Sequence, residues 1–436
     1  MGQYRKYAEI PLRQLPNRVW RSYCGGAMID RWKNESVCED GAMPEEWVAS
    51  TVVARGDNRP VDEGISKFAL PDGRVVPLTE LIADDREAFL GERIARTYGD
   101  VPLLTKLLDS CERLTIQVHP DKRFAADFLH SRFGKTEGWY VLGTRPVDGE
   151  ESYVLFGFKE GVDRAKWRDL FLRQDISGMI GALHKVRVKP GDVFIINGGV
   201  PHAIGSGCFL LELQEPTDYT MRVEKTTPRG ASLSGMLVHQ GVGEERMLDC
   251  FHYDSLSLDE TLRRWKIEPR EEILADGSTL KHLIDRRHTD CFSLSELCIP
   301  TSATLPSEGD FRVVIVYRGS GLVRAGQYEM AVRQGDELFI PARVGDLEWR
   351  VDSGADASAA LQSAPLTGLF LQYGFAPASE FIRGGGETCC IGWTVGPEMF
   401  RTTCCLAGVS AAIRSVPSVD AGHDLHAHAA VVVGAF

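Results

Sequence analysis

Two distant segments of the chain share one pattern, in which a Gly-Asp turn leads directly into a short, mainly apolar run. Residues 189–196 have the sequence KPGDVFII, and residues 333–340 have the sequence RQGDELFI. A turn of this kind followed by apolar residues is typical of the start of a buried β-strand. The repetition therefore predicts an internal duplication of one β-barrel module.

Short β-rich runs, separated by turn residues, surround both copies of the pattern. In the first half of the chain they fall at residues 114–119, 139–142, 153–158, 193–196 and 208–214, with a short helix predicted at 121–133. In the second half they fall at residues 292–298, 312–317, 320–325, 328–332 and 337–340. Many short strands at this spacing favour a sandwich or a barrel. We therefore predict a mainly β chain with two barrels in tandem.

Helical patterns occur outside the strands of the two predicted barrels. Thr79 can cap a helix near the N-terminus, and residues 91–108 predict a second helix that is interrupted near Gly99 and Pro102. Residues 228–265 have weak helical periodicity, and we expect them to form a mixed connector. The predicted units are listed by their boundaries: 1–227, 228–265, 266–380 and 381–436. We expect the last of these, a tail, to contain the opening strands of a third module or a relic of one.

Composition and charge exclude several classes of function. Lys and Arg number 49 and Asp and Glu number 61, so the formal net charge is −12. A nucleic acid or an anionic membrane would repel such a chain. No apolar run is long enough to span a bilayer, and the N-terminus lacks the apolar core of a signal peptide. The 11 cysteines include no CxxC spacing, which favours reduced thiols and a cytoplasmic protein.

One strand carries half of a candidate metal site. Gln117 and His119 are two residues apart, so their side chains leave the same face of the strand, with Thr115 beside them. Glu137 could add a carboxylate, and His202 could add a second imidazole. A lone strand histidine usually has a structural role, but this ordered set of nitrogen and oxygen donors suits zinc or another divalent transition metal.

Several motifs in the same order resemble those of type I mannose-6-phosphate isomerases. In the first predicted barrel they are QVHPDK at 117–122, KTE at 135–137, PHA at 201–203 and TDYTMR at 217–222. Upstream they are RVW at 18–20, EWVAS at 46–50 and PLLTKLL at 102–108. Members of this family are zinc-dependent enzymes with the cupin fold that interconvert mannose 6-phosphate and fructose 6-phosphate. The resemblance covers residues 10–230 well, covers the second barrel more loosely and does not extend to the tail.

The resemblance implies a fold and a set of site residues. The fold is a pair of tandem cupin barrels (double-stranded β-helix, jelly-roll), of which the first is catalytic with one Zn²⁺ and the second lacks the ligands. The implied metal ligands are Gln117, His119, Glu137 and His202. The implied catalytic and substrate-binding residues are Lys106, Thr115, Lys122, Glu212 and Arg222. The chain departs from the family at Met221, where Tyr is common, and at Arg229, where some members have Lys.

The chemistry of an aldose–ketose isomerase explains why such residue types are needed. A proton is removed next to a carbonyl and returned to the neighbouring carbon through an enediolate, so negative charge develops on two adjacent oxygens. Arg222 offers a planar cation to those oxygens or to a phosphate. The base that moves the proton could be Glu212, a metal-bound water or, if it is not a ligand, His202. The sequence leaves these three open.

Two other functions use a similar set of residues. A cupin oxygenase that uses iron would have comparable ligands, but it needs no lysine and arginine for a phosphate. A catalytically altered cupin could instead be a sugar-binding sensor with a structural metal. The presence of all four ligand types together with Arg222 favours the isomerase, acting on a small phosphorylated sugar.

Overall fold

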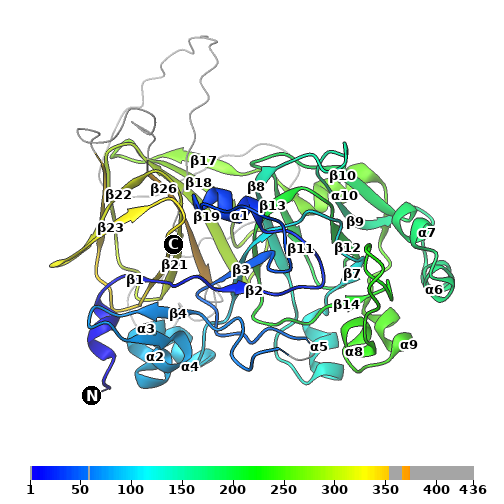
Figure 1. The fold of residues 1–436 in the computed structure, drawn as a ribbon, viewed down its shortest axis with the longest axis horizontal. Coiled ribbons are helices and arrows are strands. Elements are labelled where there is room, and N and C mark those ends of the chain that lie inside the picture. The colour runs from blue at the N-terminus through cyan, green and yellow to red at the C-terminus, as the bar shows by residue number, and fades with distance from the viewer. Residues whose placement is uncertain (1, 57–58, 353–365, 374–436) are drawn as a thin grey trace, which may run out of the picture. The chain divides into compact units, whose positions relative to one another are not determined.

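The computed structural model describes residues 2–56 and 59–352 and, for its backbone, the strand at 366–373. Most of its regular structure is β-sheet, as the mainly β prediction required (Figure 1). The predicted tail, residues 381–436, lies outside the described residues. Within the described part, no helix is both long enough and apolar enough to cross a membrane.

Two sheets come mainly from the first half of the chain. The first, called sheet I, has the order β16-β11-β8-β13-β6-β3-β2. Its strands are β2 (Arg18–Val19), β3 (Glu45–Val48), β6 (Leu104–Asp109), β8 (Glu137–Thr144), β11 (Val193–Ile196), β13 (Cys208–Gln214) and β16 (Lys266–Ile267). The second, sheet II, has the order β10-β9-β12-β7-β14, with β15 paired to β9. Its strands are β7 (Gln117–Val118), β9 (Tyr153–Lys159), β10 (Leu183–Arg187), β12 (His202–Ile204), β14 (Met221–Arg222) and β15 (Ser255–Leu256).

Two further sheets come mainly from the second half. Sheet III has the order β1-β24-β21-β26-β19-β18-β17, and sheet IV has the order β20-β25-β22-β23. Sheet III contains β1 (Leu12–Arg13), β17 (Arg270–Ile273), β18 (Thr279–Ile284), β19 (Phe292–Ile299), β21 (Arg312–Arg318), β24 (Glu337–Ile340) and β26 (Leu366–Tyr373). Sheet IV contains β20 (Ser302–Leu305), β22 (Ser320–Ala325), β23 (Tyr328–Arg333) and β25 (Leu347–Val351). A short hairpin, β4 (Lys67–Ala69) with β5 (Val75–Pro77), stands apart from the four sheets.

The two pairs of sheets enclose different interiors. Between sheets III and IV lies an apolar core that includes Val314, Val323 and Trp349. The face of sheet I that meets sheet II instead carries polar side chains, among them Glu137 on β8 and Glu212 on β13. Side chains alternate between the two faces along each strand, and this alternation places both carboxylates on the face toward sheet II. A functional site therefore fits the first pair of sheets better than the second.

The outer face of sheet I packs against sheet III. Gly138 on β8 allows a close approach, since a Cβ atom there would lie 2.3 Å from the Ile284 side chain of β18. Apolar residues of sheets I and III belong to one continuous core. The N-terminal strand β1 also joins the two halves, because Leu12 pairs with Phe339 on β24.

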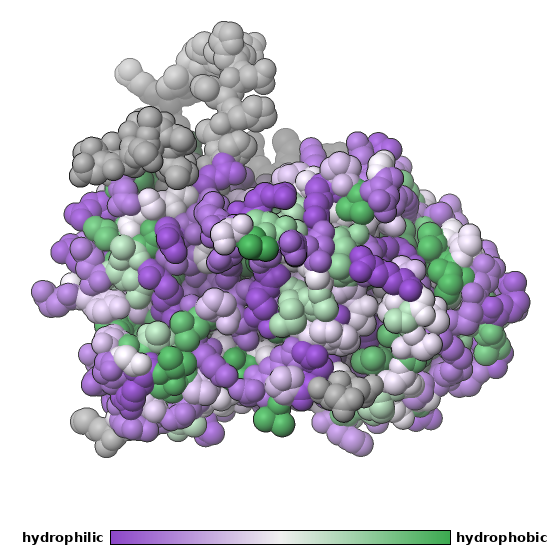
Figure 2. Space-filling model, in the orientation of Figure 1, coloured by the Kyte–Doolittle hydropathy of each residue, from purple (hydrophilic) through white to green (hydrophobic). Residues whose placement is uncertain are grey.

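Helices lie at the edges of the sheets and in the connections (Figure 1). Before β7 they are η1 (Arg5–Glu9), α1 (Ala27–Trp32), α2 (Leu78–Asp84), α3 (Arg86–Leu90) and α4 (Glu92–Thr97). The remaining helices are α5 (Lys122–Leu129), α6 (Arg164–Arg173), α7 (Ile176–Gly181), α8 (Gly235–His239), α9 (Glu244–Met247), η2 (Leu248–Cys250) and α10 (Leu258–Trp265). The connector predicted at 228–265 contains the last four helices and β15. Figure 2 shows mostly hydrophilic side chains on the face in view, with apolar ones in small separate groups.

The two Gly-Asp turns have the same geometry. Gly191 has a φ angle of 95° and Gly335 one of 94°, a region that favours glycine. In each turn the next aspartate accepts a hydrogen bond from a backbone N–H three residues earlier, at 3.0 Å for Asp192 and 2.8 Å for Asp336. Each turn then opens a buried strand, β11 or β24. This matching geometry supports the internal duplication that the sequence predicts.

One predicted element is wrong. The helix expected over residues 91–108 ends with α4 at Thr97, and residues from Leu104 onward form β6 instead. Every residue of β6 is buried, and the strand lies between β13 and β3 in sheet I. Pairing on both edges therefore outweighs the helical propensity of a leucine-rich segment. The helix predicted at 121–133 is also shorter, because α5 ends where His130 adopts a left-handed conformation.

Candidate active site

Three buried side chains from both sheets of the first pair meet in a compact cluster. His119 follows β7, His202 begins β12 and Glu137 begins β8. The Nε2 atom of His119 lies 3.0 Å from a Glu137 oxygen and 3.2 Å from Nε2 of His202. Their donor atoms all lie within 4.8 Å of one another. This separation allows one metal ion to contact all three residues.

The hydrogen bonds of the two histidines leave the Nε2 atom of each ring facing the cluster. Nδ1 of His119 lies 2.9 Å from the carbonyl oxygen of Tyr219, and Nδ1 of His202 lies 2.9 Å from that of Val200. A carbonyl only accepts, so Nδ1 carries the proton and Nε2 keeps a free lone pair. Backbone partners of this kind orient metal-binding histidines. Burial lowers the pKa of His119 to about 3 and also lowers the pKa of His202, so both rings are neutral at pH 7.

Two more polar side chains border this cluster. The side-chain amide of Gln117 lies 3.2 Å from Nε2 of His202, so a rotation of the amide would present its oxygen instead. The Lys135 ammonium donates to a Glu137 oxygen at 2.6 Å and lies 2.9 Å from Nε2 of His119. A cation is therefore attracted to the point where two lone pairs and a carboxylate converge. This donor set fits a divalent metal ion.

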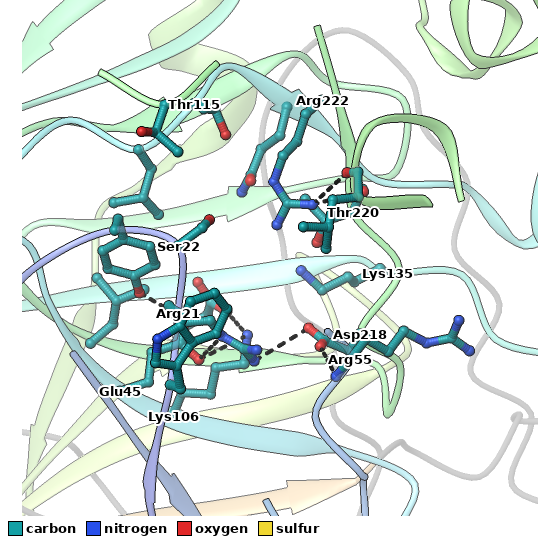
Figure 3. A pocket seen from close by; sticks show the side chains of 18 of the residues that line it. Arg21, Ser22, Glu45, Arg55, Lys106, Thr115, Lys135, Asp218, Thr220 and Arg222 are labelled. Carbon is teal, nitrogen blue, oxygen red and sulfur yellow. Dashed lines mark hydrogen bonds and ion pairs between the residues drawn. The ribbon is translucent and has the colours of Figure 1, made fainter. Parts of the chain in front are cut away.

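The cluster opens into a pocket between the sheets and the loops at their ends (Figure 3). Lys135 and Arg222 point into this space from one side, and Arg21, Glu45 and Lys106 lie on the opposite side. The charged side chains that line it, apart from the exposed Arg55, are the acids Glu45, Glu137, Glu212 and Asp218 and the cations Arg21, Lys106, Lys135 and Arg222. The buried charges of the pocket are thus balanced before any ligand binds.

Ion pairs hold the acids and cations of the pocket in place. Lys106 donates to Glu212 at 2.9 Å, and Arg21 donates to Glu45 at 2.8 Å and lies 3.4 Å from Asp218. Burial, together with the nearby charge of Glu137, raises the pKa of Glu212. Burial also acts to raise the pKa of Glu45, but the charges of Arg21 and Lys106 outweigh it and lower that pKa to about 2. Glu212 is therefore the more basic of these two carboxylates.

Arg222 lies at the wall of the pocket beside helix α8. Its Nη1 atom donates to the carbonyl oxygens of Leu237 at 2.7 Å and of Thr220 at 3.3 Å. Burial lowers the pKa of Arg222 to about 10, so the side chain stays charged at neutral pH. Both bonds use Nη1, and among the described residues the Nε and Nη2 groups have no bond of this kind. These donors are available to an anion in the pocket.

Comparison of the sequence with known proteins identifies the family. A sequence model described as the catalytic domain of type I phosphomannose isomerase matches residues 33–136. A mannose-6-phosphate isomerase of Streptococcus mutans is 30% identical over 280 residues, which cover 63% of this chain and 79% of that protein. The chain belongs to the type I phosphomannose isomerase family. It is accordingly an enzyme of the aldose–ketose isomerase class.

Further relatives agree with this assignment. A mannose-6-phosphate isomerase of Bacillus subtilis is 27% identical over 282 residues, which cover 62% of this chain and 78% of that protein. The crystal structure of a mannose 6-phosphate isomerase from Bacillus subtilis has a TM-score of 0.63 at 22% identity and covers 83% of this chain and 98% of its own. The likeness in structure shows the fold, which is the cupin fold of these isomerases.

The structure brings together most of the residues that the family resemblance implied. Gln117, Glu137, Lys106, Thr115, Glu212 and Arg222 all line the pocket, and His119 and His202 complete the cluster beneath it. Lys122 is placed elsewhere. Its side chain is half exposed, lies 3.4 Å from Asp290 and borders a separate groove that also contains His252. The separation arises because Lys122 begins helix α5, beyond the end of the strand that carries Gln117.

Apart from the exposed Arg55, four of the charged residues that line the pocket were not singled out from the sequence: Arg21, Glu45, Lys135 and Asp218. Lys135 lies two residues before Glu137 in the KTE motif, and this spacing places both side chains on the same side of an extended segment. Asp218 lies within the TDYTMR motif, and Arg21 directly follows RVW. The motifs therefore indicated where these residues lie in the chain. They did not indicate the ion pair between Arg21 and Asp218, because the two residues are far apart in the sequence.

Proposed function

We propose that this enzyme interconverts mannose 6-phosphate and fructose 6-phosphate by proton transfer through an enediolate and depends on one bound Zn²⁺. The observation that carries the proposal is the buried His119–Glu137–His202 cluster, which lies at the base of a pocket lined with balanced charges. The names of the relatives supply the substrate, since those proteins are mannose-6-phosphate isomerases.

The metal would be held by His119, Glu137 and His202, with the Gln117 amide oxygen as a fourth ligand. Two neutral imidazoles, a carboxylate and an amide oxygen form a mixed set that suits zinc. A divalent cation supplies electrostatic stabilisation for oxygens on which negative charge develops. The hydrogen bonds of both histidines to backbone carbonyls support this assignment, because they fix the rings with Nε2 facing inward.

The charge balance of the pocket supports a phosphorylated substrate. A divalent cation and a phosphate dianion bring equal and opposite charges, so together they leave the balance of the buried pocket unchanged. Arg222 would bind the phosphate or an enediolate oxygen through its Nε and Nη2 donors. The hydroxyl of Thr115 lines the same pocket and would donate a further hydrogen bond to the phosphate.

Glu212 is the general base that we favour. Its raised pKa brings it closer to neutrality, which suits a group that must both accept and return a proton. Lys106, 2.9 Å away, would hold the carboxylate in position and stabilise its negative charge. Lys135 is bonded to Glu137 of the cluster and would stabilise the oxygens of the enediolate.

We further propose that different parts of the chain have different roles. Residues 1–227 would form the catalytic unit and residues 266–380 a second barrel without metal ligands, joined by the connector 228–265. Helix α8 of the connector adds Leu237 to the pocket wall, which supports a contribution of the connector to the site. In the described part of the second barrel, no comparable group of His, Cys, Asp and Glu is present.

An activity assay tests the proposed function. Purified enzyme is given mannose 6-phosphate, and formation of fructose 6-phosphate is followed by a coupled reaction. Bound metal is measured by elemental analysis of the same sample before and after a chelator. We expect turnover that is lost with the metal and restored by Zn²⁺. A zinc-loaded enzyme that turns over neither this nor a related aldose phosphate would contradict the proposal.

A further inference from the structure

Cys24 and Cys111 lie side by side next to the pocket. The backbone N–H of Cys111 donates to the carbonyl oxygen of Cys24 at 2.9 Å. Both thiols are free, with Cys24 buried and Cys111 partly exposed. A single bond of this kind keeps the two backbones in direct contact, although neither residue lies in a strand. Residues in such contact can be bridged by a disulfide if rotation of the side chains brings the sulfurs together.

One arginine faces both sulfurs. Nη2 of Arg229 lies 3.5 Å from the Cys111 sulfur, and the guanidinium also forms a side-chain hydrogen bond with Cys24. Glu112 connects the group, because it accepts from the backbone N–H of Cys24 at 2.8 Å and lies 3.3 Å from Nε of Arg229. A cation beside a thiol favours the thiolate, which is the form that reacts with oxidants.

The hydrogen bond between the thiols gives them different roles. Burial raises the pKa of Cys111 to about 12, and the hydrogen bond with Cys24 adds to this shift. Cys111 therefore holds its proton more tightly than a free thiol does. Cys24 faces the Arg229 guanidinium, and we assign to it the attack on the oxidant.

The thiol pair and Arg229 adjoin two segments that line the pocket. Ser22 and Tyr23 line the pocket and directly precede Cys24. Thr227 and Pro228 line it and directly precede Arg229. Tyr23 donates to Glu45 at 2.7 Å, so a shift of Cys24 reaches the ion pairs around Arg21. A covalent bond at this point would change the position of pocket residues as well as the sulfurs.

We propose that Cys24 and Cys111 form a reversible disulfide in response to a peroxide and that this bond lowers the activity of the adjacent pocket. The effect on activity rests on the proposed function, whereas formation of the bond does not.

The reaction balances with hydrogen peroxide as the oxidant. The Cys24 thiolate attacks one peroxide oxygen, the O–O bond breaks, and the released hydroxide takes up a proton to become water. The Cys24 sulfenic acid is then attacked by the Cys111 sulfur, which loses its proton. The S–O bond breaks and a second water leaves. In total, two thiols are oxidised to one disulfide and one peroxide is reduced to two waters.

Peptide mapping of the full-length enzyme tests the bond directly. The enzyme is treated with hydrogen peroxide, the remaining thiols are blocked with N-ethylmaleimide, and tryptic peptides are analysed by mass spectrometry. We expect peptide 22–31 linked to peptide 107–113, and release of the link by dithiothreitol. Failure to find this link while other thiols become oxidised would overturn the inference.

Matched variants separate the pair from the other cysteines. Cys111→Ser should abolish the link, whereas Cys38→Ser, which removes another partly exposed thiol, should keep it. Arg229→Gln should slow link formation several-fold, and Arg229→Lys should restore most of the rate because it returns the charge. Equal rates in wild type and both Arg229 variants would exclude the assigned role of the guanidinium.

Activity measurements test the second half of the proposal. We expect peroxide to lower isomerase turnover several-fold in the wild type and in Cys38→Ser, with recovery in dithiothreitol, and to have little effect on Cys111→Ser. The inference that the disulfide lowers activity would be overturned if the link forms without a change in turnover. It would also be overturned if peroxide lowers the activity of Cys111→Ser as much as that of the wild type. An untreated enzyme without isomerase activity would instead count against the proposed function and leave the mapping result valid.

Discussion

The ammonium nitrogen of Lys135 lies 2.9 Å from Nε2 of His119, and both side chains are buried. The same ammonium is bonded to Glu137, two residues along the chain. Lys135 thus places a positive charge where the lone pairs of the cluster converge. Burial lowers the pKa of Lys135, which makes it easier for this group to lose its proton than for a lysine in water.

Replacement of Lys135 tests its part in the reaction. We expect Lys135→Met to lower kcat/KM by about 100-fold, in the range found when a positioned charge is removed from an active site. Metal binding should not weaken, since the ammonium competes for the same lone pairs. Steady-state kinetics and elemental analysis of the same preparation measure both effects. Full activity in Lys135→Met would exclude a direct role.

Removal of a metal ligand should have a different result. His119→Ala is expected to lose metal affinity by more than about 100-fold, beyond the usual effect of losing an outer partner of a ligand. Activity should fall with the metal content. His130→Asn is a matched control, because His130 lies at the end of α5 in a left-handed conformation that Asn also adopts. Equal metal content in His119→Ala and wild type would contradict the assigned cluster.

Arg222 should affect activity and leave the metal in place. We expect Arg222→Ala to lower kcat/KM by about 100-fold or more with unchanged metal content, because the side chain faces the pocket and does not contact the cluster. Arg222→Lys should recover only part of the loss, since one ammonium cannot reproduce a planar guanidinium. The mechanism proposed above fails if Arg222→Ala keeps wild-type activity.

The two lysines that the resemblance implied as site residues should differ in their effect on activity. Lys106 is buried in the pocket against Glu212, whereas Lys122 is half exposed beside Asp290. We expect Lys106→Met to reduce kcat/KM by about 100-fold and Lys122→Met to change it by less than about threefold, as surface ion pairs contribute little. A large loss of activity in Lys122→Met, with a normal Tm, would restore the role that the resemblance implied for it.

A second buried carboxylate should make stability depend on pH. Glu337 forms an ion pair with Lys33 at 2.7 Å and accepts a hydrogen bond from Gln14 at 3.0 Å. Burial raises its pKa from 4.5 to about 8, and nearby Glu46 adds to the effect. Between these two pH values the folded protein holds a proton that the unfolded chain has lost. Folding stability should therefore fall as the pH rises through this window.

The variant Glu337→Gln measures that dependence. Its side chain cannot ionise, so Tm should change less between pH 5 and pH 8 than in the wild type, by a few degrees. Glu329→Gln on the exposed side of β23 is the control and should leave the slope unchanged. An identical slope in Glu337→Gln and wild type would mean that Glu337 is ionised in the folded protein throughout this range.

Much of the β-structure follows from local patterns. The strands predicted at 193–196, 208–214, 320–325 and 337–340 coincide with β11, β13, β22 and β24. These segments combine apolar residues with flanking turns, and both signals are contained within about ten residues. In residues 102–108 the local signals did not distinguish a strand from a helix, because the spacing of the leucines fits the periodicity of both. Only pairing with β13 and β3 decided in favour of a strand.

The sequence by itself determined the donor types of the cluster and their pairing within a strand. Gln117 with His119, and Lys135 with Glu137, share a side because side chains of an extended chain alternate with a period of two. Which charges share the pocket was decided only by the tertiary structure. Lys106 meets Glu212 across two paired strands, whereas Lys122 turns away on a helix that begins directly after His119 and Pro120. Local periodicity fixes the direction of a side chain on its own element, but contacts between distant elements depend on how the sheets close around the site.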